Sequence, residues 1–168
     1  MVIETREPAD PELSRLVAAQ QAELAERYGD EDGHFPLDPA ARFLVAVDGG
    51  EAVGCGAVQR LDERTAELKR MYVRPDRRGE GISRLLLAAL EDAARAAGHE
   101  LLRLEAGTRQ PEAVGLYTRS GYRPIPAYGM YAGNPLSLCF EKELRFEEEP
   151  PPAGLRSGAA RASGAGGA

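Results

Sequence analysis

Leu68–Leu90, LKRMYVRPDRRGEGISRLLLAAL, joins a strand-like run to an amphipathic helix through a turn rich in arginine and glycine. Gly79 and Gly81 let the backbone approach a ligand closely, so that successive N–H groups can converge on an anion. The positive end of the following helix dipole points to the same place, and Arg77 and Arg78 add charge there. The stretch predicts a pyrophosphate cradle. From this stretch alone, a plain loop that caps a helix is an open alternative.

The strand before this turn changes the face on which its apolar residues lie. Leu68, Met71 and Val73 are apolar, and strict alternation would place Leu68 opposite the other two. A bulge near Arg70 or Met71 would return all three to one core face. The pattern therefore predicts a bulge, with a simple edge-strand irregularity as the alternative.

A second motif, QPEAVGLYTRSGY, occupies residues 110–122. Pro111 suits the first turn of a helix, and Gly121 suits its left-handed end. The first motif resembles the acetyl-CoA loop of the GNAT superfamily of N-acetyltransferases, [QR]-x-x-G-x-[GA]. The second resembles that superfamily's N-x-x-A-x-x-L-Y-x-x-x-G-[FY] segment. Because both occur in the expected order and spacing, together they are far more specific than either one alone.

Three positions depart from the superfamily pattern. Asp76 stands where the loop prefers Gln or Arg, Ser83 where a further Gly is common, and Gln110 where the segment has Asn. The matching residues are Arg78, Gly79, Glu80 and Gly81 in the loop, and Ala113, Leu116, Tyr117, Gly121 and Tyr122 in the segment.

The resemblance implies a single α/β (α+β) domain over residues 1–146, with a mixed, mostly antiparallel sheet flanked by helices. The bulged strand would splay from its neighbour, and the pantetheine arm of acetyl-CoA would lie in the gap against the main chain of Met71 and Val73. The residues expected to bind acetyl-CoA are Met71, Tyr72, Val73, Arg77, Arg78, Gly79, Glu80, Gly81, Ile82, Ser83, Gln110 and Ala113.

Periodicity and turn residues predict the individual elements. Asp48-Gly49-Gly50 indicates a hairpin. Helices are expected over residues 11–28, with Asp10 as the cap, and over 81–97 and 112–120; strands are expected over 42–47, 51–60, 67–73, 101–106 and from 122 onward. The expected apolar stripe of the 81–97 helix is Leu85, Leu86, Ala89, Leu90 and Ala93. Residues 147–168, rich in Pro, Gly and Ala, are expected to be a disordered tail.

Composition limits the partners and the location. The formal charge of −6 and the pI near 5.1 argue against nucleic acid, which requires a basic face. No apolar run reaches membrane-spanning length, and the N-terminus does not resemble a signal peptide. Cys55 and Cys139 lie in apolar segments, which is typical of buried cytoplasmic thiols rather than a disulfide. The sequence predicts a cytoplasmic protein without a metal site.

Acetyl transfer to an amine sets the chemical requirements. An alkylamine has a pKa of ~10.4, so a base or a desolvating pocket must remove its proton, and the leaving thiolate needs an acid. By resemblance, Tyr117 is the expected acid, with core packing as its other role. A backbone N–H near Met71 is expected to stabilise the oxyanion. Glu67 is the candidate base, acting through a water; a solvated charge at the strand end is the alternative.

The acceptor is expected to be a small molecule with a primary amine, attacked by direct transfer in a ternary complex. The candidate acceptor-binding residues are Glu26, His34, Glu105, Tyr128 and Tyr131. His99 is expected to face solvent. Two other functions stay open: acetylation of protein lysines or N-termini, and a non-catalytic acyl-CoA-binding module. A homodimer through the last strands is an expectation from the resemblance.

Overall fold

The computed structural model describes residues 1–29 and 37–144, which form one seven-stranded sheet with the order β1-β2-β3-β4-β5-β7-β6. The elements are β1 (Val2–Arg6), α1 (Pro11–Tyr28), β2 (Arg42–Asp48), β3 (Glu51–Arg60), β4 (Thr65–Val73), η2 (Pro75–Arg77), α2 (Ile82–Ala96), β5 (Leu101–Gly107), α3 (Pro111–Arg119), β6 (Arg123–Ile125), η3 (Gly129–Tyr131) and β7 (Ser137–Glu143). Only the β4–β5 pair is parallel among them. The mixed, mostly antiparallel sheet is therefore confirmed. The predicted tail and His34 lie outside the described residues.

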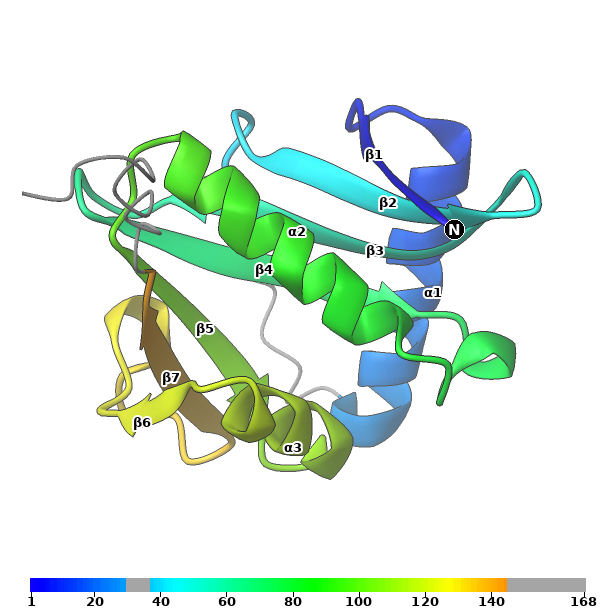
Figure 1. The fold of residues 1–168 in the computed structure, drawn as a ribbon. Coiled ribbons are helices and arrows are strands. Elements are labelled where there is room, and N and C mark those ends of the chain that lie inside the picture. Colours follow the sequence, from blue (N-terminus) through cyan, green and yellow to red (C-terminus); the bar gives the residue numbers. More distant parts are fainter. Residues whose placement is uncertain (30–36, 145–168) are drawn as a thin grey trace, which may run out of the picture.

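The helices cover both faces of the sheet (Figure 1). On one face, α2 packs over Leu44 and Val53 in a core that extends to Leu116 of α3. On the other face, α1 packs Leu13 against Val45 in a smaller core. Adjacent β2 residues enter different cores because side chains alternate along a strand. Among the described residues, no helix is long and apolar enough to cross a membrane.

The predicted ends of the first helix and the first hairpin are confirmed. The Asp10 carboxylate accepts a hydrogen bond from the Leu13 N–H at 3.0 Å, as expected of a helix cap. Gly49 and Gly50 join β2 to β3 with φ values of 58° and 81°. Positive φ at both positions is what the favoured two-residue hairpin turn requires, which explains the glycine pair.

The predicted stripe of α2 is partly wrong. Leu85 is 50% exposed, whereas Ile82 and Leu86 are fully buried, along with Leu87 and Ala94. Including Ile82 and Leu87 moves the centre of the apolar arc around the helix, away from Leu85. The predicted apolar stripe wrongly included Leu85 and left out Ile82 and Leu87.

His99, expected to face solvent, is 7% exposed. Helix α2 ends at Ala96, and Gly98, two residues later, has a φ of 88°; the next N–H, that of His99, donates to the Ala94 carbonyl at 3.0 Å. This reversal folds the residue after the glycine back against the helix, which is why His99 is covered.

The predicted bulge lies in β4. Cys55 pairs with Tyr72 and Ala57 pairs with Lys69, so that one β3 residue faces two residues of β4. Arg70 has a φ of 59°, a left-handed conformation that costs a residue with a side chain roughly 1–2 kcal/mol. The parallel β4–β5 ladder ends at the pair Leu68–Leu104, so the two strands separate beyond this point. The bulge and the splay are both confirmed.

Candidate active site

A groove of 560 Å³ runs between α1, the start of α2 and α3. It is called the donor groove below, and it is lined by Gln20, Glu23, Leu24, Met71, Tyr72, Val73, Arg77, Arg78, Gly79, Gly81, Ile82, Ser83, Arg84, Gln110, Glu112, Ala113, Leu116 and Arg119. All of the residues expected to bind acetyl-CoA line it except Glu80, which instead pairs with Arg77. The groove therefore brings the two sequence motifs together.

The glycine turn leaves the N-terminus of α2 open to this groove. Gly79 and Gly81 have φ values of 82° and 83°, and a Cβ at either position would meet nothing within 4 Å. No side chain caps the first turn of α2, and no acidic residue lies in it. Uncapped N–H groups at the positive end of a helix form a site for an anion. The local geometry therefore fits a pyrophosphate group.

The two arginines of the turn have different environments. Arg77 is held by the carboxylates of Glu80 and Asp48 and braces the loop against the β2–β3 hairpin. Arg78 donates to the Val73 carbonyl at 3.0 Å and to Glu23 of α1 at 2.7 Å. Arg78 thus places its charge within the groove, where a carboxylate of the same chain now neutralises it.

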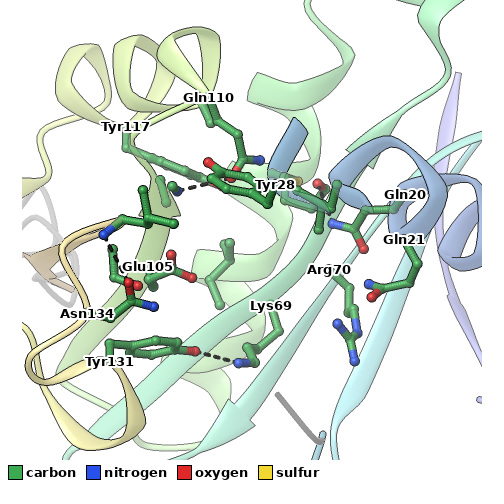
Figure 2. A pocket seen from close by; sticks show the side chains of 18 residues that line it. Gln20, Gln21, Tyr28, Lys69, Arg70, Glu105, Gln110, Tyr117, Tyr131 and Asn134 are labelled. Carbon is green, nitrogen blue, oxygen red and sulfur yellow. Dashed lines mark hydrogen bonds between the residues drawn. The ribbon is translucent and has the colours of Figure 1, made fainter. Parts of the chain in front are cut away.

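The donor groove continues into a smaller cavity of 140 Å³, called the acceptor pocket below (Figure 2). Its lining comes from α1, the bulge of β4, the end of β5, α3 and the segment before β7. The residues that line both cavities are Gln20, Leu24, Met71, Gln110 and Ala113. The junction lies where β4 and β5 separate.

Tyr117 lines the acceptor pocket from α3 and is 5% exposed. Its ring packs edge-on against Tyr122, with 5.7 Å between centroids. Burial, with a smaller contribution from the Glu105 carboxylate, raises the pKa of the Tyr117 phenol above its ordinary value. The phenol therefore keeps its proton at neutral pH, as a general acid must.

Glu67 is buried, at 3% exposure, so the alternative of a solvated strand-end charge is wrong. Its carboxylate accepts hydrogen bonds from Gln59 at 2.7 Å and from the Tyr128 hydroxyl, and it lies 3.8 Å from the Lys69 ammonium. Glu67 lines neither cavity. Lys69, whose ammonium lies 3.8 Å from it, does line the acceptor pocket.

Lys69 was missed by the sequence reasoning. Its Nζ donates to the Tyr131 hydroxyl at 2.6 Å, and its side chain is 9% exposed. Burial lowers the pKa of Lys69, and the nearby Arg70 lowers it further, while Glu67 and Glu105 oppose the shift. The available signal was its position beside the predicted bulge, where side-chain direction departs from strand alternation.

Gln110 holds the entrance of α3 in place. Its Oε1 accepts hydrogen bonds from the Gly107 N–H at 3.0 Å and from the Tyr28 hydroxyl at 3.4 Å. The same Tyr28 hydroxyl accepts from the Arg109 N–H at 3.1 Å, and a Cβ on Gly107 would overlap it. Gln110 and Tyr28 therefore tie α1 to the β5–α3 turn at the junction of the cavities.

The acceptor candidates separate into two groups. Glu105 and Tyr131 line the acceptor pocket. Tyr128 lines neither cavity and holds Glu67, while Glu26 is exposed on α1 and lines neither cavity. The structure thus brings Glu105, Tyr131 and Tyr117 to one pocket but does not bring Glu26 there.

The α1 side of the site was also missed. Gln20 donates to the Met71 carbonyl at 3.0 Å, so the main-chain group expected to contact pantetheine already has a side-chain partner. Gln20 Oε1 and Gln21 Nε2 are buried without a hydrogen-bond partner within the described residues. Both glutamines line the acceptor pocket. Buried polar atoms of this kind are costly, so they are candidate ligand contacts.

Comparisons with known proteins point to one family. A model of the acetyltransferase (GNAT) family matches residues 9–122. An IAA acetyltransferase of Azospirillum brasilense is 38% identical over 152 residues, covering 86% of this chain and 98% of that protein. The crystal structure of a proposed acyl-CoA N-acyltransferase from Klebsiella pneumoniae is 39% identical, with a TM-score of 0.76 over 86% of this chain and 97% of that one. A GNAT acetyltransferase from Elizabethkingia anophelis, solved with acetyl-CoA bound, shares the fold at 18% identity, with a TM-score of 0.65 over 84% of this chain and 97% of that one.

Proposed function

The chain belongs to the GNAT acetyltransferase family, and on that premise we propose that it transfers the acetyl group of acetyl-CoA to a primary amine of a small molecule by direct attack in a ternary complex. One observation carries the proposal. The donor groove ends at an uncapped helix N-terminus on one side and opens into a smaller pocket lined by Tyr117 on the other.

The donor groove supports acetyl-CoA as the donor. The backbone N–H groups around Gly79 and Gly81 and the guanidinium of Arg78 would hold the pyrophosphate. The gap beyond Leu68 and Leu104 leaves the β4 main chain without a β5 partner, so it can pair with the amides of an extended arm. Acetyl-CoA, when bound, supplies a thioester whose acetyl carbon is electrophilic and whose thiolate leaves.

Tyr117 would hold the proton that the thiolate needs. Its phenol lines the pocket near the junction and stays protonated because burial raises its pKa. A backbone N–H of β4 near Met71 would face the developing negative charge, because the bulge frees this part of the strand from regular pairing. The acid would then come from α3 and the oxyanion donor from β4.

The amine must lose a proton to a base or to a dry pocket. Glu105 lines the acceptor pocket, whereas Glu67 lies behind Lys69 and is already bound by Gln59 and Tyr128. We therefore propose Glu105 as the carboxylate that receives the proton, and we propose that Glu67 acts through Lys69 and Tyr128, which it holds in position. The pH profile described in the Discussion separates these roles.

A small acceptor fits the pocket better than a peptide. The acceptor pocket has 140 Å³ and is bordered by Tyr131, Asn134 and Leu136 from the segment before β7.

The experiment is a turnover assay that detects free CoA over a panel of amines and lysine peptides. The expected result is acetyl-CoA-dependent CoA release with at least one small amine and none with peptides. Release only with peptides would replace the small-molecule proposal, and no release with any amine would overturn it.

A further inference from the structure

Two cationic side chains border the acceptor pocket from consecutive positions, Lys69 and Arg70. In a regular strand, neighbouring residues point to opposite faces of the sheet. Here the bulge and the φ of 59° at Arg70 bring both residues to one cavity. Figure 2 shows them on the side of the pocket away from Tyr117 and Gln110. A strained backbone that turns a charge toward a cavity is typical of binding sites.

A buried donor from α1 lies on the same side. The Nε2 atom of Gln21 is buried and has no hydrogen-bond partner within residues 1–29 and 37–144. Gln21 and Arg70 both line the pocket, and Figure 2 shows them on the same side of it. Amide, guanidinium and ammonium groups all donate hydrogen bonds, so this wall offers donors to an oxyanion.

The charges of the lining favour an acceptor that carries a negative group. The charged residues that line the pocket are Lys69, Arg70 and Glu105, and Glu67, which lines neither cavity, lies 3.8 Å from Lys69. An alkylamine enters as an ammonium ion at neutral pH, and the cationic wall repels it when it has no other charge. An anion attached to the amine reverses that repulsion.

Resting on the proposed function, we propose that the acceptor is zwitterionic, with an oxyanion held by Lys69, Arg70 and Gln21 while its amine points toward Glu105 and Tyr117. The oxyanion is a carboxylate or a phosphonate, since both accept several charge-assisted hydrogen bonds. The bulged stretch of β4 thus selects the acceptor at one end and borders the donor groove at the other.

The test compares acceptors that differ in one group. β-Alanine, its uncharged amide and propylamine have similar length, and aminoethylphosphonate supplies the second type of oxyanion. We expect kcat/KM for at least one of the two acceptors that carry an oxyanion to exceed that of both acceptors without one by roughly 10- to 100-fold, the range of a charged hydrogen bond. The better of the two anionic acceptors identifies the type of oxyanion.

Variants assign this preference to the bulge. In Arg70→Gln we expect the anionic-to-neutral ratio to fall about tenfold, mainly through KM, and Arg70→Lys should restore part of it. The matched control is Arg64→Gln, because Arg64 is exposed and pairs with Glu100 outside the pocket; its ratio should equal that of the parent. A thermal shift with acetyl-CoA verifies that each variant is folded.

The outcomes separate the two proposals. Equal kcat/KM for amines with and without an oxyanion, or an unchanged ratio in Arg70→Gln, overturns the zwitterionic acceptor while the acetyltransferase activity remains. An absence of CoA release with every amine overturns the proposed function, and the acceptor inference with it.

Discussion

The donor groove and the acceptor pocket meet at Met71 but are built differently. The anion-binding end of the groove comes from one short stretch, residues 77–83, and depends on backbone N–H groups and two left-handed glycines. The acceptor pocket collects side chains from α1, β4, β5, α3 and the segment before β7. One half of the site is local in sequence, and the other is assembled by the fold.

The difference follows from what each half binds. A constant pyrophosphate can be held by main-chain groups, which no ordinary substitution removes. An acceptor must be distinguished from other amines, and this requires side chains whose charge and shape can vary. Changes in the groove should therefore affect every acceptor equally, whereas changes in the pocket should alter the ranking of acceptors.

Tyr117→Phe should produce the largest effect. It keeps the ring that packs on Tyr122 and removes the acid, so the rate with a good acceptor should fall roughly 10²–10⁴-fold. Stability should change by no more than about 1 kcal/mol, and acetyl-CoA should still bind. Burial raises the pKa of Tyr117 above its ordinary value, so Tyr117 keeps its proton up to about pH 10. At any pH below that value, the parent rate should therefore not decrease through loss of this proton. A parental rate in a single-turnover experiment would make Tyr117 a packing residue only.

Gly81→Asp should abolish acetyl-CoA binding, because it places a carboxylate against the pyrophosphate. The parent should gain about 2.7 kcal/mol of stability when acetyl-CoA is at a hundred times its dissociation constant, and the variant should gain none. Gly50→Asp is the matched control, since its φ of 81° is close to the 83° of Gly81 and it too has open space around a Cβ. A full thermal shift in Gly81→Asp would remove the cradle assignment.

Glu105→Gln and Glu67→Gln should differ in their pH profiles. Without Glu105 the rate should fall about tenfold or more at neutral pH and recover at higher pH, where more of the amine is already neutral. Glu67→Gln should keep the shape of the parental profile but lose roughly 1–3 kcal/mol of stability, since Lys69 and Tyr128 lose a buried carboxylate. Both profiles are measured over pH 6 to 10. If Glu67→Gln loses rate at neutral pH and recovers at higher pH while Glu105→Gln keeps the parental profile, Glu67 is the base, as the sequence predicts.

Glu23→Gln should have the smallest effect, and it should be a gain. Glu23 holds Arg78 at 2.7 Å, so removing its charge frees the guanidinium for the pyrophosphate. We expect acetyl-CoA to bind a few times more tightly, consistent with about 0.2–1 kcal/mol for a partly exposed ion pair. Calorimetric titration at low and high salt measures this gain, which should shrink as salt screens the pair. Weaker binding would show that Glu23 positions Arg78 instead of competing for it.

The local half of the site is the half that the sequence predicts well. Gly79, Gly81 and the start of α2 are consecutive, and the chemistry of a glycine turn before a helix is the same in any fold. The bulge also left a local trace, because Leu68, Met71 and Val73 break strand alternation. Helix α1 and the glycine hairpin were predicted for the same reason, since Asp10 and Gly49-Gly50 act on adjacent backbone.

The acceptor pocket could not be predicted in this way. Gln21 is one polar residue among many on α1, and only the packing of α1 beside β4 brings it to the same pocket as Arg70. Glu67 is a charge at a strand end in the sequence, and its burial depends on Gln59 and Tyr128, which lie on other elements. The exposure of Leu85 shows the same limit, because the face of α2 that is buried is set by the sheet beneath it.

Hydrogen exchange on the parent protein tests the division into donor groove and acceptor pocket most directly. With acetyl-CoA alone, amides in residues 71–83 should exchange more slowly, because the ligand binds main-chain N–H groups there, while residues 128–137, before and at the start of β7, should change little. Slower exchange confined to residues 128–137, or unchanged exchange at residues 79–83, would contradict a donor site built from the glycine turn.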